Sequence, residues 1–140
     1  MTVLVNNVAV LEKAMFSQMP WDKIEGTMHV NMDSMLELTY HFLSKSSKIR
    51  AIINVSSYTT LVPIQRTAIY AATKAFMNSL TSVLAMERKD VDILYVLPVF
   101  ITTAMAENIY IPGVSSLPDE LVNGSIRALG WDTESIGCAK

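Results

Sequence analysis

Three short apolar runs, separated by two long segments of helical pattern, restrict the possible fold more than any other feature of this sequence. The runs lie at 2–5, 49–55 and 92–97, and each is followed by a polar pair or by proline. The segments between them, about 21–45 and 67–88, carry Met, Leu and Ala near helical spacing. Connections of this length force neighbouring strands to run parallel, with right-handed crossovers. The sequence therefore predicts an α/β fold with a doubly wound parallel sheet.

The rest of the chain adds little regular structure to this prediction. We expect a loop over 56–65, a short helix over about 119–129, and weak structure in the polar last ten residues. Three strands are fewer than the five or six that open sheets of this kind usually hold. The prediction is a single domain, 1–140, with about three strands and flanking helices.

Composition and charge exclude several classes of function. The chain is 51% hydrophobic and 17% charged, which is typical of a folded domain and not of a disordered one. The net charge of −2, without any Lys/Arg cluster, argues against nucleic-acid binding. A single cysteine, Cys138, excludes an internal disulfide and a multi-cysteine zinc site. His29 and His41 have no partner at metal-ligand spacing, so no metal site is expected.

The sequence gives no sign of a membrane span or a secretory leader. No apolar run reaches the ~20 residues that cross a bilayer. The first residues, MTVLVNN, lack the basic start and the cleavage pattern of a signal peptide. Judged from these residues alone, the expected location is cytoplasmic.

Candidate motifs follow all three predicted strands. These are Asn6 with Asn7, Ser56 with Ser57, and the segment 98–105, PVFITTAM. The carboxyl ends of parallel strands share one edge of the sheet, which is where such folds bind ligands. Tyr70 and Lys74 come early in the helix that follows the second strand. We therefore expect them near the same edge.

The run YAATKAF places Tyr70 and Lys74 four residues apart, on one face of a helix and roughly 5–6 Å apart at Cβ. A phenol beside an ammonium can perform acid chemistry, because a nearby cation favours the phenolate. Judged alone, the pair could equally be a packed phenol and a solvated amine. Asn31 is also unusual, because a short amide in mid-helix competes for the backbone hydrogen bonds.

Five motifs, in order and at matching spacing, resemble those of the short-chain dehydrogenase/reductase family. The family's N-N-A-G, mid-helix asparagine, active-site serine, Y-x-x-x-K and P-G-x-V-x-T are matched by residues 6–9, Asn31, Ser57, Tyr70 with Lys74, and 98–103. The strings N-N-V, IINVSS, Y-x-A-T-K-A-F and T-A-M are similar to the microsomal branch. That branch holds 17-beta-hydroxysteroid dehydrogenases and very-long-chain 3-ketoacyl-CoA reductases.

This resemblance implies a fold and an activity. The fold is the C-terminal half of a Rossmann-like domain. The activity is NADP(H)-dependent reduction or oxidation of a keto or hydroxy group on a lipophilic steroid or long-chain acyl substrate. The resemblance also implies a homodimer, formed through the two long helices, and a location at the endoplasmic reticulum.

It further implies a role for each matched residue. Tyr70 protonates the substrate carbonyl oxygen, which Ser57 also hydrogen-bonds, while Lys74 lowers the pKa of the phenol and holds the nicotinamide ribose. Asn31 disturbs its helix so that a water can link Lys74 to solvent. The implied catalytic residues are Asn31, Ser57, Tyr70 and Lys74. The implied cofactor-binding residues are Asn6 and Asn7 beside the adenosine, and Tyr70, Lys74, Ile101 and Thr103 at the nicotinamide end.

Two departures from the family pattern leave a second hypothesis open. None of the five glycines follows a strand in the family's G-x-x-x-G-x-G pattern, so the domain is predicted to lack the N-terminal glycine-rich half. Ala9 and Val99 stand where the family usually has glycine, and a Cβ there can crowd the cofactor or forbid a positive φ. The alternative function is that of a truncated, non-catalytic relative, which acts as a binding or dimerising module.

Overall fold

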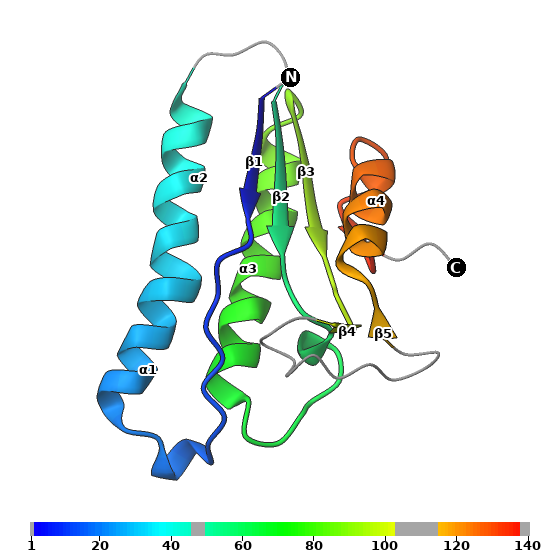
Figure 1. Ribbon diagram of the computed structural model, residues 1–140. Coiled ribbons are helices and arrows are strands. Elements are labelled where there is room, and N and C mark those ends of the chain that lie inside the picture. Colours follow the sequence, from blue (N-terminus) through cyan, green and yellow to red (C-terminus); the bar gives the residue numbers. More distant parts are fainter. Residues whose placement is uncertain (1, 46–49, 103–114, 138–140) are drawn as a thin grey trace.

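The computed structural model describes residues 2–45, 50–102 and 115–137, and a parallel sheet forms its centre (Figure 1). The strands pair in the order β1-β2-β3-β6 and all run parallel. Their bounds are Thr2–Asn6 for β1, Arg50–Val55 for β2, Val91–Val96 for β3 and Glu134–Ser135 for β6. The predicted α/β fold with a parallel sheet and flanking helices is confirmed.

Helices lie on both faces of the sheet, as Figure 1 shows. On one face, Ile52, Val91 and Ile93 form a core cluster with side chains of α2 (Ser34–Ser44) and α3 (Ala68–Glu87), which are Phe42, Leu43, Leu84 and Ala85. On the other face, Ile53, Leu94 and Val96 pack against Leu121 and Ala128 of α4 (Pro118–Ala128). Successive strand residues point to opposite faces, so β2 and β3 each contribute to both clusters.

The first strand, β1, forms an edge of the sheet and is poorly covered. Val3 and Val5 are 39% and 54% exposed, although the residues beside them on β2, Ala51 and Ile53, are buried. Helix α4 lies over β3 and β6 and makes few contacts with β1, so it does not cover the two valines. An apolar edge strand of this kind is a template for pairing with another chain.

The segment predicted as one helix over 21–45 consists of three parts. Helix α1 (Trp21–Met28) is followed by a π-helical turn, η2 (His29–Asp33), and then by α2. The backbone N–H of Ser34 donates to the carbonyl of His29, five residues earlier, which is the π-helical hydrogen bond. Asn31 lies in the middle of this wide turn, where the sequence predicts a disturbance of the helix.

The second long helix, α3, agrees with the predicted range 67–88 and is about 30 Å long. It begins after Thr67, whose side chain donates to the carbonyl of Ile64 and so closes the preceding turn at 2.8 Å. Tyr70 and Lys74 therefore lie in the first two turns of a rigid element. None of the helices in the described ranges is long and apolar enough to cross a bilayer.

The weak structure expected in the last ten residues is wrong at β6. The backbone N–H of Tyr95 donates to Thr133 O at 2.9 Å, and the Tyr95 hydroxyl donates to the Glu134 carboxylate. A two-residue strand of polar composition has no apolar pattern, so only its pairing with β3 reveals it. The remaining short elements are η1 (Phe16–Gln18), η3 (Tyr58–Thr60), β4 (Phe100–Ile101) and β5 (Ser115–Ser116).

Candidate active site

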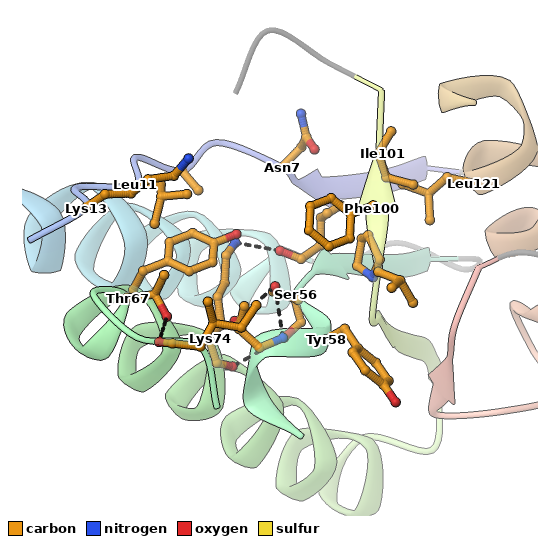
Figure 2. Close-up of a pocket in the computed structure, with 18 residues that line it drawn as sticks. Asn7, Leu11, Lys13, Ser56, Tyr58, Thr67, Lys74, Phe100, Ile101 and Leu121 are labelled. Atoms are coloured by element: carbon orange, nitrogen blue, oxygen red, sulfur yellow. Dashed lines mark hydrogen bonds between the residues drawn. The ribbon is translucent and has the colours of Figure 1, made fainter. Parts of the chain in front are cut away.

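A cavity of about 540 Å³ lies at the carboxyl ends of β1, β2 and β3 (Figure 2). The structure brings five of the predicted site residues together on its wall, which are Asn7, Ser57, Tyr70, Lys74 and Ile101. Asn6 and Asn31 are not part of that wall. Thr103 lies outside the described residues. The expected edge of the sheet is therefore where these side chains gather, as the topology requires.

The local backbone fixes Ser57 at the end of β2. Its φ and ψ of −160° and 148° keep the chain extended, and its Oγ accepts from the Thr59 N–H at 3.2 Å and from the Thr59 hydroxyl at 3.0 Å. The next residue, Tyr58, donates its N–H to Pro98 O at 2.9 Å, which joins this turn to the loop after β3. Ser57 is consequently held from both sides and is 8% exposed.

Tyr70 faces the cavity from the first turn of α3 and is 9% exposed. Burial raises the pKa of its phenol, and a hydrogen bond with Ser57 acts in the opposite direction. We expected Lys74 to lower this pKa, but burial is the larger effect in the structure. The physical reason is the cost of ionising a buried phenol, which outweighs the nearby ammonium, 5.7 Å from the centre of the phenol ring and hydrogen-bonded to Val55 O.

Lys74 is 1% exposed, and its ammonium donates to the carbonyl oxygen of Val55 at 2.6 Å. Burial lowers the pKa of this amine from its ordinary value to about 8. A cation in such a position is expensive to desolvate, so its proton is held less tightly than in water. Lys74 therefore combines a positive charge at neutral pH with a proton that can be lost near pH 8.

Asn31 acts through three hydrogen bonds of its side chain. Its Oδ1 accepts from the Val10 N–H at 2.8 Å, while its Nδ2 donates to Val10 O at 3.0 Å and to the Thr73 hydroxyl at 3.1 Å. Thr73 lies between Tyr70 and Lys74 on α3. Asn31 thus connects the loop after β1 with the helix that carries the phenol and the ammonium.

The two asparagines that end β1 have different surroundings. Asn6 is 6% exposed, and its Nδ2 donates to Asn54 Oδ1 at 2.7 Å and to Thr39 Oγ1 at 3.1 Å. This network lies between β1, β2 and α2, in the interior of the domain. Asn7 is exposed and lines the cavity. Of the pair, Asn7 alone can reach a ligand in the cavity as the structure stands.

Ala9 and Val99, where the family usually has glycine, both line the cavity. Neither residue has a positive φ. In the described ranges, Arg66 is the sole residue other than glycine that has one. Their methyl and isopropyl groups therefore form part of the wall without straining the backbone.

Sequence reasoning missed the apolar side of the cavity, which is formed by Leu11, Ile64, Phe100 and Leu121. No motif marks these residues. Leu11 and Ile64 lie in loops, Phe100 lies in β4 and Leu121 lies in α4, so only the fold brings them together. The described lining contains no carboxylate, and its charged residues, Lys13 and Lys74, are both cationic.

Comparison with known proteins agrees with the motifs. The profile of the short chain dehydrogenase family matches residues 1–111. The human 17-beta-hydroxysteroid dehydrogenase type 3 is 30% identical over 97% of this chain and 46% of its own length. A very-long-chain 3-oxoacyl-CoA reductase-like protein of Arabidopsis thaliana is 32% identical over 76% of this chain and 37% of its own length.

Solved structures show the same fold. A structure from work on 7beta-hydroxysteroid dehydrogenase stereoselectivity superposes with a TM-score of 0.84 at 24% identity, over 96% of this chain and 56% of that chain. A 3-ketoacyl-(acyl-carrier-protein) reductase from Brucella melitensis, complexed with NADH, superposes with a TM-score of 0.82 at 21% identity, over 96% and 64%. The chain spans about half the length of the curated relatives that it matches. From its profile match and its human relative, this chain belongs to the short-chain dehydrogenase family.

Proposed function

We propose that this chain carries the catalytic half of a short-chain dehydrogenase domain. Its reaction is the NADP(H)-dependent reduction or oxidation of a keto or hydroxy group. The observation that supports the proposal best is the meeting of Ser57, Tyr70 and Lys74 on the wall of one cavity. These residues come from the end of β2 and from α3, so the fold is what brings them together.

The donor set of the cavity suits the nicotinamide end of a dinucleotide. A phenol and a buried ammonium can bind the hydroxyls of the nicotinamide ribose, and the backbone of Ile101 can hold a carboxamide, while the exposed amide of Asn7 is left for the adenosine part. The cavity volume of about 540 Å³ lies within the usual range for small-molecule sites. When bound, the cofactor supplies or accepts a hydride.

Within this site, Tyr70 gives its proton to the substrate oxygen during reduction and takes it back during oxidation. The raised pKa keeps the phenol protonated at neutral pH, which suits the reduction direction. The Ser57 hydroxyl bonds the same substrate oxygen and orients it toward the phenol. Lys74 keeps a positive charge close to Tyr70, which favours the phenolate as the proton leaves.

We propose a lipophilic steroid or long-chain acyl compound as the substrate. The apolar side of the cavity, formed by Leu11, Ile64, Phe100 and Leu121, can bury rings or an alkyl chain. The names of the relatives, a 17-beta-hydroxysteroid dehydrogenase and a very-long-chain 3-oxoacyl-CoA reductase-like protein, support both classes. Either substrate carries a carbonyl that Tyr70 and Ser57 could bind.

The test is a substrate panel followed by the absorbance of the reduced nicotinamide. A 17-ketosteroid and a long-chain 3-ketoacyl-CoA are supplied with NADPH, and with NADH in parallel, to wild-type protein and to Tyr70→Phe. Turnover that depends on Tyr70 and prefers NADPH supports the proposal. Absence of turnover, together with absence of NADPH binding even at millimolar concentration, contradicts it and supports the alternative binding or dimerising module.

We also propose a homodimer through the face that α2 and α3 share. A groove of about 380 Å³ runs between these helices, and its lining is largely apolar, with Leu36, Tyr40, Leu43, Leu80 and Leu84. Tyr40 and Met86 on the same helices are 71% and 73% exposed. Sedimentation at micromolar concentration should show a dimer that Met86→Glu weakens, and a folded wild-type monomer would contradict this assembly.

The location at the endoplasmic reticulum, which the resemblance implies, is part of the same proposal. A fluorescent fusion of the protein should colocalise with a marker of that membrane. A diffuse cytosolic signal would contradict it.

A further inference from the structure

Arg66 has an unusual backbone conformation for a residue with a side chain. Its φ of 68° lies in the left-handed region, and no other residue except glycine shares this in the described ranges. The left-handed region brings Cβ close to the following carbonyl oxygen, so an arginine is strained there and a glycine is not. Strain of this kind persists only where the surrounding structure enforces it, and it is common at ligand sites.

The conformation of Arg66 directs its carbonyl oxygen to a distant segment. That oxygen accepts from the Ala14 N–H at 3.2 Å. Arg66 lies in a turn that the Thr67 hydroxyl closes by donating to Ile64 O at 2.8 Å, and Thr67 itself is 6% exposed. The carbonyl of Arg66 is therefore presented from a turn with a fixed geometry, directly before α3.

Both segments joined by this hydrogen bond line the cavity. Leu11 and Lys13 belong to the loop after β1, and Ile64 and Thr67 belong to the turn before α3. Figure 2 shows Leu11, Lys13 and Thr67 on the same side of the site. The bond between Ala14 and Arg66 thus connects two parts of one wall.

The loop after β1 is held at two points, with lining residues between them. Asn31 accepts from the N–H of Val10 and donates to its carbonyl, which fixes the start of the stretch. The bond from Ala14 to Arg66 fixes its end. Leu11 and Lys13 lie between these anchors, so loss of the second one would release them on one side only.

We propose that Arg66 is a positioning residue, whose left-handed backbone holds the loop after β1 against the start of α3. The backbone carbonyl is the working group, and the guanidinium takes no part. This inference rests on the proposed function. Arg66 sets the position of Leu11 and Lys13 in the cavity wall, and this position affects the binding of substrate. The Ser57, Tyr70 and Lys74 side chains lie beyond the anchored stretch and keep their places without it.

The test compares substitutions that differ in backbone preference. Arg66→Gly and Arg66→Asn remove the guanidinium but tolerate a positive φ, whereas Arg66→Val disfavours it strongly because valine is β-branched. Hydrogen exchange is followed by mass spectrometry on peptides that cover 8–16. We expect wild-type protection or better in the glycine variant, and exchange at least tenfold faster in the valine variant. Peptides from β2 and β3 serve as the internal control for global unfolding.

If Arg66→Val fails to fold, Arg66→Ala replaces it, because alanine keeps the unfavourable Cβ without β-branching. The comparison of alanine with glycine then isolates the backbone, since both lack the guanidinium. Faster exchange over 8–16 in alanine than in glycine supports the proposal. Equal exchange in the glycine, alanine and wild-type proteins would overturn it, as would equal acceleration in glycine and valine.

Kinetics gives the readout that a merely structural role would not move. We expect Arg66→Val to raise KM for the keto substrate about tenfold while kcat changes less than about threefold, and Arg66→Gly to restore KM. A loss of kcat at unchanged KM would overturn the positioning role. The exchange measurement needs no turnover, so a protein without activity would contradict the proposed function and leave the exchange test of Arg66 decisive.

Discussion

The ammonium of Lys74 donates to the carbonyl oxygen of Val55, the last residue of β2, at 2.6 Å. This bond ties the second turn of α3 to the end of a central strand. An ammonium has three protons, so it can keep this bond and still donate to a ligand in the cavity. The sheet therefore orients the one buried charge on α3 in the described structure, and several measurable properties depend on it.

The first prediction concerns stability between pH 8 and pH 10. Burial lowers the pKa of Lys74 to about 8, whereas in the unfolded chain the lysine stays protonated up to about pH 10.4. The unfolded state therefore binds more protons over this range, and the free energy of unfolding should rise with pH, by up to roughly 3 kcal/mol. Below pH 8 both states are protonated, so Lys74 contributes no slope there.

Urea unfolding at pH 7, 8, 9 and 10 measures this effect. Lys74→Met should abolish the rise, while Lys23→Met, which changes an exposed lysine, should keep it. The range stops at pH 10 because burial also raises the pKa of Tyr70, which acts against stability above that pH. An unchanged slope in the Lys74 variant would show that another group is responsible.

The second prediction concerns the phenol. Tyr70→Phe removes the proton donor but keeps the buried ring at the start of α3. General acid catalysis typically contributes 10²–10⁴-fold, so kcat should fall by about that factor. The dissociation constant of NADPH, followed by its fluorescence, should change only a few-fold. Turnover close to wild type would exclude Tyr70 as the acid.

The third prediction concerns the exposed edge of β1. A lysine on an apolar edge strand opposes pairing with another chain, so Val5→Lys should reduce aggregation of the isolated chain. Val122 on α4 is 54% exposed, the same fraction as Val5, which makes Val122→Lys a matched control. Light scattering at equal concentration should fall for the strand variant alone. Equal effects of both variants would point to general hydrophobicity instead.

The fourth prediction concerns the phosphates of the cofactor. A polypeptide of these 140 residues contains no glycine-rich turn after a strand, so it cannot offer the usual helix N-terminus to a pyrophosphate. We expect NADPH to bind it in the millimolar range, about −4 kcal/mol. Fusion to a glycine-rich βαβαβ segment should improve both affinity and solubility. Micromolar binding by the polypeptide alone would show that other residues hold the phosphates.

The strands and the meeting of Ser57, Tyr70 and Lys74 could be predicted from sequence for a common reason. The apolar runs mark buried strands, and parallel topology brings their carboxyl ends to one edge whatever the details of packing. Asn6 and Asn7 show the limit of this reasoning. Neighbouring residues at a strand end point in opposite directions, so one asparagine enters the interior and the other faces the cavity.

Features that depend on tertiary contacts could not be predicted in the same way. The pairing of β6 requires the backbone of Tyr95 and its neighbours, because Glu134 and Ser135 carry no strand pattern of their own. The left-handed backbone conformation of Arg66 is locally unfavourable for arginine. In the fold it occurs together with a tertiary contact, the hydrogen bond from Ala14 N–H to Arg66 O. Local sequence contains neither contact.

The π-helical turn η2 keeps the buried residues of α1 and α2 on one face of the segment. The residues buried along α1, η2 and α2 include Thr27, Asn31, Met35 and Thr39, four apart each time. In a regular α-helix each step of four residues drifts by about 40°, so three steps would rotate the last residue about 120° away from the first. A π turn takes up one extra residue, about 100° of rotation, and keeps all four on one face.

The segment from α1 to α2 therefore contains one residue more than a regular α-helix would need to keep these buried residues on one face. Deletion of Met32 within η2 should convert the turn to α-helix and leave the faces of α1 and α2 aligned, at the cost of the hydrogen bonds of Asn31. Deletion of Leu38 within α2 should instead turn the rest of that helix by about 100° and expose its buried face. Circular dichroism melting of the two variants compares them, and equal loss of structure would contradict this account. We thus expect a shortening of the chain to be tolerated where the helix widens and not along its regular turns.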